Sequence, residues 1–163
     1  MKIRVTTDAG TTYMATVDKY VKLAPHFRLV ELANNLGDSS IQQWVDTPES
    51  RLFVVMLEEF RVWYDLPMVI TSCYRQPEWN RKVGGDHRSA HLRGAAADWH
   101  IKHTDEQREN VRKKWSSICS KYGVIGAINY YTTGYHLEAF SDRCYGNKTF
   151  VVRDYRGTAR DWR

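Results

Sequence analysis

Residues 89–98 decide the fold, and they run Ser-Ala-His-Leu-Arg-Gly-Ala-Ala-Ala-Asp. A catalytic zinc ion takes three protein ligands from His, Asp or Glu and leaves a fourth position open. His91 and Asp98 supply two such ligands, and the small residues between them let the backbone pass close to an ion. Gly94 permits a sharp turn into the segment that carries Asp98. Taken alone, a His and an Asp at this spacing usually arise by structural accident, so the neighbouring segments must be considered.

Several ordered motifs flank this stretch. Residues 71–80 run Thr-Ser-Cys-Tyr-Arg-Gln-Pro-Glu-Trp-Asn, and residues 83–85 are Val-Gly-Gly. Residues 27–32 are Phe-Arg-Leu-Val-Glu-Leu, and residues 130–138 are Tyr-Tyr-Thr-Thr-Gly-Tyr-His-Leu-Glu.

The stretch 89–98 resembles the signature S-x-H-x-x-G-x-A-x-D of the zinc D-alanyl-D-alanine carboxypeptidases and related cell-wall endopeptidases. It matches every fixed position of that signature, and the flanking motifs extend the resemblance over about residues 27–140. The hedgehog signalling domain shares the same scaffold. The opening motif at 27–32 is similar to the version found in phage lysis proteins.

The resemblance implies a zinc ion bound by His91, Asp98 and His136. It also implies that Arg75 binds the substrate through a carboxylate or carbonyl of the peptide stem. A guanidinium suits this role because it donates two parallel hydrogen bonds to a carboxylate. The competing interpretation of Arg75 is an ordinary salt bridge.

The sequence departs from the family at two positions. Cys73 stands where relatives usually have Gly, and Thr133 stands where many relatives have the carboxylate that activates water. Residues two apart on a strand share a face, so Glu138 should point the same way as His136. Glu138 is therefore the candidate general base or the residue that orients His136, although it could also be an ordinary strand residue.

A few other polar residues complete the candidate site. Tyr131 is a candidate hydrogen-bond donor to the substrate oxyanion, although it could simply pack. If Glu138 has no role, the alternatives for the base are His100, Asp86 and His87. His26 and His103 are not expected to take part, and His26 should lie on the surface.

The pattern of apolar residues predicts a single mixed domain. The 163 residues are 42% hydrophobic, which is enough for one core and too little for two, so residues 1–163 should form one zinc peptidase domain. A hairpin is expected at 2–7 and 11–17, a short helix at 27–35 and a loop at 38–46. Two longer helices should follow the caps Thr47 and Thr104, with a largely irregular functional loop at 75–94. Strands are expected at 68–71, 95–101, 124–131, 134–140 and 149–153.

Strands and helices mix without regular alternation, which indicates the α+β class. The resemblance makes this more specific: a hedgehog/DD-peptidase-like antiparallel sheet with helices packed on one side.

Charge and cysteine content restrict the partners. The net charge is +5 and the pI is near 9.1, values that suit nucleic acid, an anionic membrane surface or an acidic polymer such as the cell wall. An ordinary basic surface with no such partner is the competing interpretation. The C-terminal arginines match no nucleic-acid motif, so no nucleic-acid partner is expected; they are Arg153, Arg156, Arg160 and Arg163. Cys73, Cys119 and Cys144 are odd in number and widely spaced, which indicates reduced thiols.

The N-terminus lacks the features of a signal peptide, and no apolar run is long enough to span a bilayer. We therefore expect a monomer made in the cytoplasm, without a membrane anchor. It would act on the cell wall after release, as a phage endolysin does, or as part of a virion.

Two functions remain in competition. The first is zinc-dependent hydrolysis of the peptidoglycan stem peptide, as a D-Ala-D-Ala carboxypeptidase or an endopeptidase, with Glu138, Arg75 and Tyr131 as the catalytic residues. The second is a zinc-binding structural or wall-binding module that has lost turnover. Thr133 is the main support for the second function.

Overall fold

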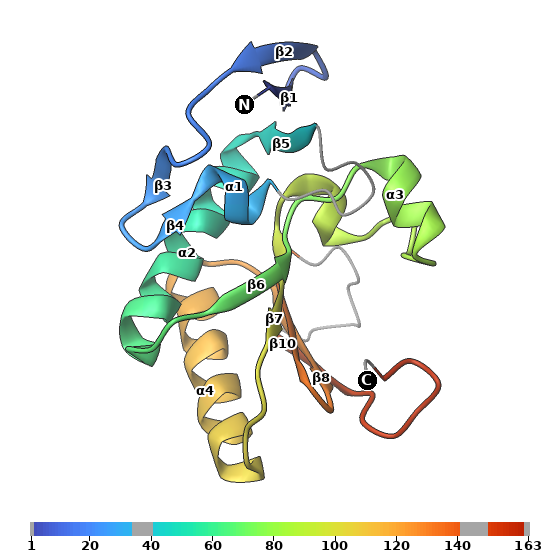
Figure 1. Ribbon diagram of the computed structural model, residues 1–163. Coiled ribbons are helices and arrows are strands. Elements are labelled where there is room, and N and C mark those ends of the chain that lie inside the picture. Colours follow the sequence, from blue (N-terminus) through green and yellow to red (C-terminus); the bar gives the residue numbers. More distant parts are fainter. Residues whose placement is uncertain (1, 34–40, 141–149, 162–163) are drawn as a thin grey trace.

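The computed structural model describes residues 2–33, 41–140 and 150–161, and Figure 1 shows their arrangement. The larger sheet has five strands, in the order β10 (Phe150–Asp154), β8 (Gly126–Tyr131), β9 (Gly134–Ala139), β7 (Ala96–His100) and β6 (Val69–Ser72). A three-stranded sheet lies at the N-terminal end, in the order β2 (Thr12–Thr16), β1 (Lys2–Thr7) and β5 (Gln42–Asp46). This mixture of sheets and helices confirms the α+β class.

The N-terminal sheet begins with the predicted hairpin. β1 (Lys2–Thr7) pairs antiparallel with β2 (Thr12–Thr16), and the turn between them is closed by a hydrogen bond from the Gly10 N–H to the Thr7 carbonyl at 2.9 Å.

β5 (Gln42–Asp46) completes this sheet by pairing in parallel with β1. The prediction of a loop over 38–46 is therefore wrong for residues 42–46, while residues 38–40 lie outside the described part of the chain. Trp44 and Val45 are buried in the core, and this burial outweighs the polar character of their neighbours.

A short segment connects the hairpin to β5. β3 (Lys22–Ala24) and β4 (Phe27–Arg28) form a two-stranded ribbon, and α1 (Leu29–Leu32) follows directly. The helix predicted over 27–35 is thus limited to a single turn in the described residues. Its apolar side chains nevertheless enter the core, since Phe27, Leu29 and Leu32 are all buried.

α2 (Pro48–Tyr64) follows the N-cap that the sequence predicts. The Thr47 hydroxyl accepts a hydrogen bond from the Ser50 N–H at 3.1 Å, and Pro48 occupies the first turn. Phe53 and Phe60 lie on its buried stripe.

α4 (Asp105–Lys121) also has the predicted capping box. The Thr104 hydroxyl accepts from the Gln107 N–H, and the Gln107 side chain accepts from the Thr104 N–H at 2.9 Å. Trp115 is fully buried and packs edge-on against Phe60 of α2, with ring centroids 5.8 Å apart.

The central sheet carries most of the residues of interest. Its strands are β6 (Val69–Ser72), β7 (Ala96–His100), β8 (Gly126–Tyr131), β9 (Gly134–Ala139) and β10 (Phe150–Asp154). The first four pair antiparallel, whereas β10 runs parallel to β8. The sheet is therefore mixed and not wholly antiparallel, because the direction of a last strand depends on the path of the chain before it.

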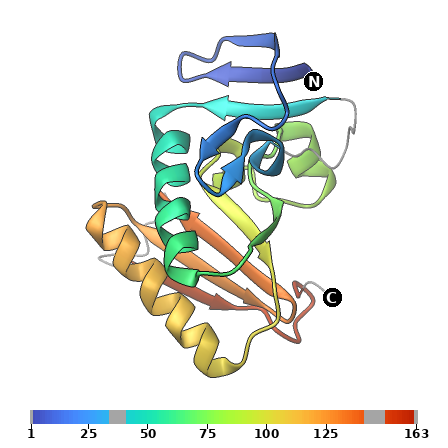
Figure 2. The ribbon, with the colours of Figure 1, turned by 60° about the vertical axis from the view of Figure 1, so that its left-hand side comes forward.

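The two faces of this sheet have different chemistry. Helices α2 and α4 lie on one side of it (Figure 2), where Trp99 stacks on Tyr135 and meets Phe60 edge-on. Because strand residues alternate between faces, Asp98 and His136 point to the opposite side. The helices thus cover the apolar face, and the polar face is left for a site.

Candidate metal centre

His91 reaches the polar face from a loop. It lies in the 3₁₀ turn η1 (Ala90–Arg93), and Gly94 ends that turn with a φ of 67°. A Cβ on Gly94 would lie 2.8 Å from Val45 Cγ1, so a side chain is excluded both by conformation and by space. The glycine therefore sets the close spacing between His91 and the strand that carries Asp98.

The backbone selects the tautomer of His91. Nδ1 lies 2.6 Å from the carbonyl oxygen of Cys73, so Nδ1 carries the proton and donates it. Nε2 is then an acceptor that points at the polar face of the sheet. Because the contact uses a backbone carbonyl, Cys73 serves it as well as the Gly of relatives would, and its own side chain is buried in the core.

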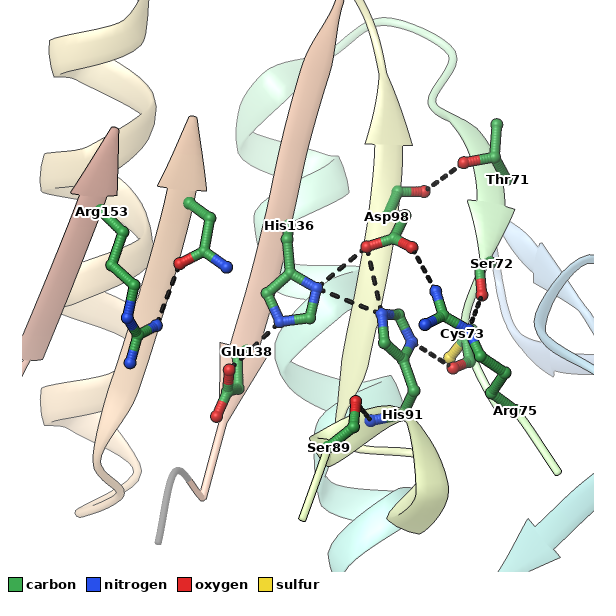
Figure 3. A network of polar contacts seen from close by, with 11 residues as sticks. Thr71, Ser72, Cys73, Arg75, Ser89, His91, Asp98, His136, Glu138 and Arg153 are labelled. Carbon is green, nitrogen blue, oxygen red and sulfur yellow. Dashed lines mark hydrogen bonds and ion pairs between the residues drawn. The ribbon is translucent and has the colours of Figure 1, made fainter. Parts of the chain in front are cut away.

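Asp98 and His136 are direct neighbours on β7 and β9. The Asp98 Oδ1 atom lies 2.9 Å from His136 Nδ1 and 3.1 Å from His91 Nε2. The two nitrogens are 3.1 Å apart. Figure 3 shows the three side chains converging from η1, β7 and β9.

These three atoms suit a metal ion. Ligand bonds of about 2.0–2.1 Å at tetrahedral angles place ligand atoms about 3.3 Å apart, close to the separations observed. Two imidazoles and a carboxylate are a donor set typical of catalytic zinc. Among the described residues, His91, Asp98 and His136 form a buried cluster able to hold an ion.

The electrostatics of the cluster also indicate a cation site. Burial alone would raise the pKa of Asp98, but the adjacent imidazoles of His91 and His136 hold it well below its usual range. Burial lowers the pKa of His91. Burial acts the same way on His136, but hydrogen bonds to Asp98 and Glu138 raise its pKa to about 9. The protein therefore keeps one anionic carboxylate against two imidazoles, and a metal would replace the proton between them.

The cluster forms one wall of a cleft of about 460 Å³, whose lining includes Arg75, Tyr131 and Glu138. Burial raises the pKa of Tyr131 to about 12, so its phenol stays protonated at neutral pH and can donate a hydrogen bond. The structure thus brings all six sequence-predicted site residues to one cleft. Their roles in catalysis stay predictions.

Arg75 follows β6 and points at the cluster (Figure 3). Its Nη2 donates to Asp98 Oδ2 at 2.7 Å, and its Nε donates to the Ser72 hydroxyl at 3.2 Å. The salt bridge that was the competing interpretation of Arg75 is therefore present, between Arg75 and Asp98. One edge of the guanidinium is directed at the protein, which orients Asp98.

Glu138 contacts the outer nitrogen of His136. Its Oε2 atom accepts from His136 Nε2 at 3.1 Å, while Nδ1 of the same ring faces the cluster. A carboxylate in this position fixes the ring and makes its free nitrogen a better ligand.

Most of the other candidates are absent from the described lining of the cleft. His100 is exposed, His87 is exposed on a loop, and Thr133 is absent from the described residues that line the cleft. Asp86 does line the cleft. His26 is on the surface beside Glu58, as expected.

His103 bonds the hydroxyls of Tyr64 and Tyr135 on the face of the sheet that the helices cover. It therefore lies away from the cluster.

Sequence reasoning missed three residues of the cleft, of which Arg88 lies on the loop before η1. Asn129 on β8 and Arg153 on β10 both line it. The alternation of β8 would have placed Asn129 on the face of Tyr131. Arg153 had been grouped with the C-terminal cations, and no local signal separates it from them.

The buried thiols agree with the predicted reduced state. Cys73 and Cys119 are free, while Cys144 lies outside the described residues.

No helix in the described ranges is both long and apolar enough to cross a membrane.

Comparison with known proteins adds the family. A search among curated proteins found no match. A family model described as Peptidase M15 matches residues 25–133, which include Arg75, His91 and Asp98. His136 lies just beyond the end of that match and joins the cluster through strand pairing. The match covers most of the chain, and the cluster has the ligands that such an enzyme needs. The chain therefore belongs to the M15 peptidases, a family of zinc-dependent metallopeptidases.

Proposed function

We propose that this protein hydrolyses peptide bonds in the stem peptide of peptidoglycan, as a D-alanyl-D-alanine carboxypeptidase or an endopeptidase on the hedgehog/DD-peptidase scaffold. The observation that carries the proposal is the cluster of His91 Nε2, Asp98 Oδ1 and His136 Nδ1 within 2.9–3.1 Å of one another in a cleft. His91, Asp98 and His136 would hold a zinc ion there, which would supply Lewis acidity for the carbonyl and lower the pKa of water.

The chain's own residues position and stabilise the reacting groups. Arg75 holds Asp98 in place, with the rest of its guanidinium at the cleft for a substrate oxygen. Tyr131, protonated at neutral pH, donates to the oxygen on which negative charge develops.

We assign Glu138 to orienting His136, because its Oε2 atom contacts the nitrogen that faces away from the cluster. Asp86 is then the candidate for moving the proton. It lines the same cleft, and 37% of its side-chain surface is exposed to solvent.

The substrate follows from the family and from charge. The net charge of +5 would concentrate the protein on an anionic wall polymer. The motif at 27–32 is similar to the one in phage lysis proteins, so we include in the proposal the role of a phage endolysin or a virion-associated lysin. The protein would act as a monomer.

A second function has one specific observation in its favour. Thr133 stands where many relatives have a carboxylate, and its carbonyl is used to bind the Ile101 N–H at 3.0 Å. A protein that holds zinc and binds the wall without turnover would need no base.

Hydrolysis of defined muropeptides separates the two functions. Zinc-loaded protein is incubated with purified peptidoglycan and muropeptides, with and without chelator, and the products are identified by mass spectrometry. We expect hydrolysis that chelator abolishes and that His91→Ala or His136→Ala lowers to background. His26→Ala, which removes an imidazole far from the cleft, is the matched control. Wall binding without any cleaved product would contradict the proposal and favour the module without turnover.

A further inference from the structure

A single row of paired residues crosses the whole central sheet. Ser72 pairs with Asp98, Asp98 with His136, His136 with Asn129, and Asn129 with Arg153. Directly paired residues point to the same face, so this row forms a polar strip on the side away from α2 and α4. The candidate ligands occupy its middle, and a cationic side chain ends it on β10.

Arg153 belongs to the cleft by contact as well as by register. It lines the cleft together with the candidate ligands, and it is half-buried. Its Nη1 donates to Asn129 Oδ1 at 3.0 Å, and Asn129 is itself buried on β8. Figure 3 shows Arg153 on the other side of His136 from Arg75. The asparagine thus holds the guanidinium over the strand adjacent to His136.

Arg75 and Arg153 both line the cleft but make different contacts there. The Nε and Nη2 edge of Arg75 is directed at Ser72 and Asp98, where it shapes the ligand cluster. Arg153 donates through Nη1 to a neutral amide, and its half-buried side chain lines the cleft. A guanidinium in a half-buried cleft attracts carboxylate more strongly than one in open solvent, because screening is weaker there.

The distance along the strip limits where such a carboxylate lies in a substrate. Neighbouring strands are about 4.8 Å apart, so the guanidinium over β8 lies about one strand spacing from β9. An extended peptide advances about 3.3–3.6 Å per residue. A carboxylate bound by Arg153 is therefore within about two residues of a bond held at the ligand cluster.

We propose that Arg153, positioned by Asn129, is a specificity-determining residue that binds a free carboxylate of the substrate within about two residues of the cleaved bond. This inference rests on the proposed function for the identity of the peptide, but not for the existence of the anion subsite. Arg75 then orients Asp98 and offers the rest of its guanidinium to a substrate oxygen beside the cluster, whereas Arg153 binds a carboxylate further along the strip.

Binding of defined peptides tests the subsite without requiring turnover. The probes are a synthetic stem tetrapeptide and pentapeptide with all carboxylates free, and versions in which each carboxylate in turn is an amide. Dissociation constants are measured by calorimetry with zinc-loaded and with chelator-treated wild-type protein, Arg153→Gln, Arg153→Lys and Arg112→Gln. Arg112 pairs with Glu109 on α4, so its variant removes the same charge away from the cleft.

We expect amidation of one particular carboxylate to weaken wild-type binding by about tenfold to a hundredfold, the range of a charge-assisted hydrogen bond. In Arg153→Gln this penalty should disappear, and Arg153→Lys should keep part of it because the charge remains. Arg112→Gln should show the wild-type penalty. Persistence of the effect in chelator-treated protein shows that the carboxylate is bound by Arg153 and not by a metal.

Two results would overturn the inference. Either the wild type is indifferent to every amidation, or Arg153→Gln keeps the full penalty. Hydrolysis of the same peptides is scored separately. An Arg153-dependent penalty without hydrolysis supports the subsite and contradicts the proposed enzyme, whereas hydrolysis without that penalty does the reverse. Arg153→Lys carries the test if the glutamine variant does not fold.

Discussion

At the scale of single residues, the two nitrogens of His136 have different partners. Nδ1 faces Asp98 Oδ1 at 2.9 Å, and Nε2 donates to Glu138 Oε2 at 3.1 Å. The orienting carboxylate is only two residues from the ligand, on the same face of β9. Glu138 can therefore influence chemistry at the cluster without touching a substrate.

Glu138→Gln separates the two roles considered for this residue. Because the carboxylate contacts the outer nitrogen of His136, we expect zinc affinity to fall by about ten- to a hundredfold. The rate of the fully zinc-loaded variant should change little. Zinc affinity is measured by competition with a chromogenic chelator, and the rate on muropeptides at saturating zinc.

A general base would behave differently. The rate at saturating zinc would then drop by about a hundred- to ten-thousandfold while zinc affinity stayed the same. Glu59→Gln, whose carboxylate binds Lys121 on the helix-covered side, is the control. That outcome would return Glu138 to the role of base.

At the scale of elements, the pairing of β7 with β9 brings Asp98 and His136 together. Gly134 is the first residue of β9 and pairs with His100 of β7. A Cβ there would lie 2.2 Å from the Trp99 carbonyl oxygen, which is backbone and cannot move aside alone. The glycine is required by space, and the register of the ligands depends on it.

Gly134→Ala should therefore affect both stability and metal binding. We expect a loss of about 1–3 kcal/mol in the free energy of unfolding, as for overpacked sites, measured by denaturant titration of metal-free protein. Zinc affinity should fall as well, because the added methyl group pushes β9 away from β7 and so displaces His136, two residues further along β9.

Gly10→Ala is the matched control for this prediction. Gly10 has a φ of 77° but nothing within 4 Å of its missing Cβ. Its variant should lose stability through backbone strain alone and bind zinc normally. Equal zinc affinities in the two variants would show that β7 and β9 tolerate the extra methyl group.

At the scale of the whole molecule, metal binding should be coupled to folding, because the candidate ligands come from η1, β7 and β9. An ion that binds only the folded chain stabilises it by mass action. The residues that orient the two imidazoles lie outside the cluster: the Cys73 carbonyl contacts His91 and the Glu138 carboxylate contacts His136. Removal of the metal should therefore lower the stability of the whole sheet.

Chelation should lower the melting temperature by an amount that depends on pH. In the metal-free protein the pKa of His136 is raised to about 9, so its protonated form stabilises the fold fully below about pH 6.5. That contribution is lost as the pH rises through about 9. Zinc requires the neutral imidazole, so its affinity should rise over the same range.

The gap in melting temperature between zinc-loaded and chelated protein should thus widen from about pH 6 to about pH 9. With zinc at about a thousand times its dissociation constant, the stabilisation is about 4 kcal/mol, or about 10 °C for a domain of this size. Calorimetric scans of both forms at several pH values provide the measurement. A gap that stays constant or narrows as the pH rises would contradict the raised pKa of His136.

The sequence by itself determined the features that depend on a few neighbouring residues. The caps at Thr47 and Thr104, the hairpin turn and the alternation of β7 and β9 follow from hydrogen bonds and burial within one element. The signature at 89–98 and its flanking motifs led to the peptidase family and to three candidate ligands that the fold brings together.

Only the tertiary structure decided the rest. The polar segment at 42–46 became β5 because β1 offered it backbone partners and a buried face, and β10 took its direction from β8. Tertiary structure also places the Cys73 carbonyl against His91, where it selects the tautomer. It places Arg153 in the lining of the cleft as well. Pairing between strands is set by chain segments far apart in sequence, so no local pattern of residues records which side chains will share one row of a sheet.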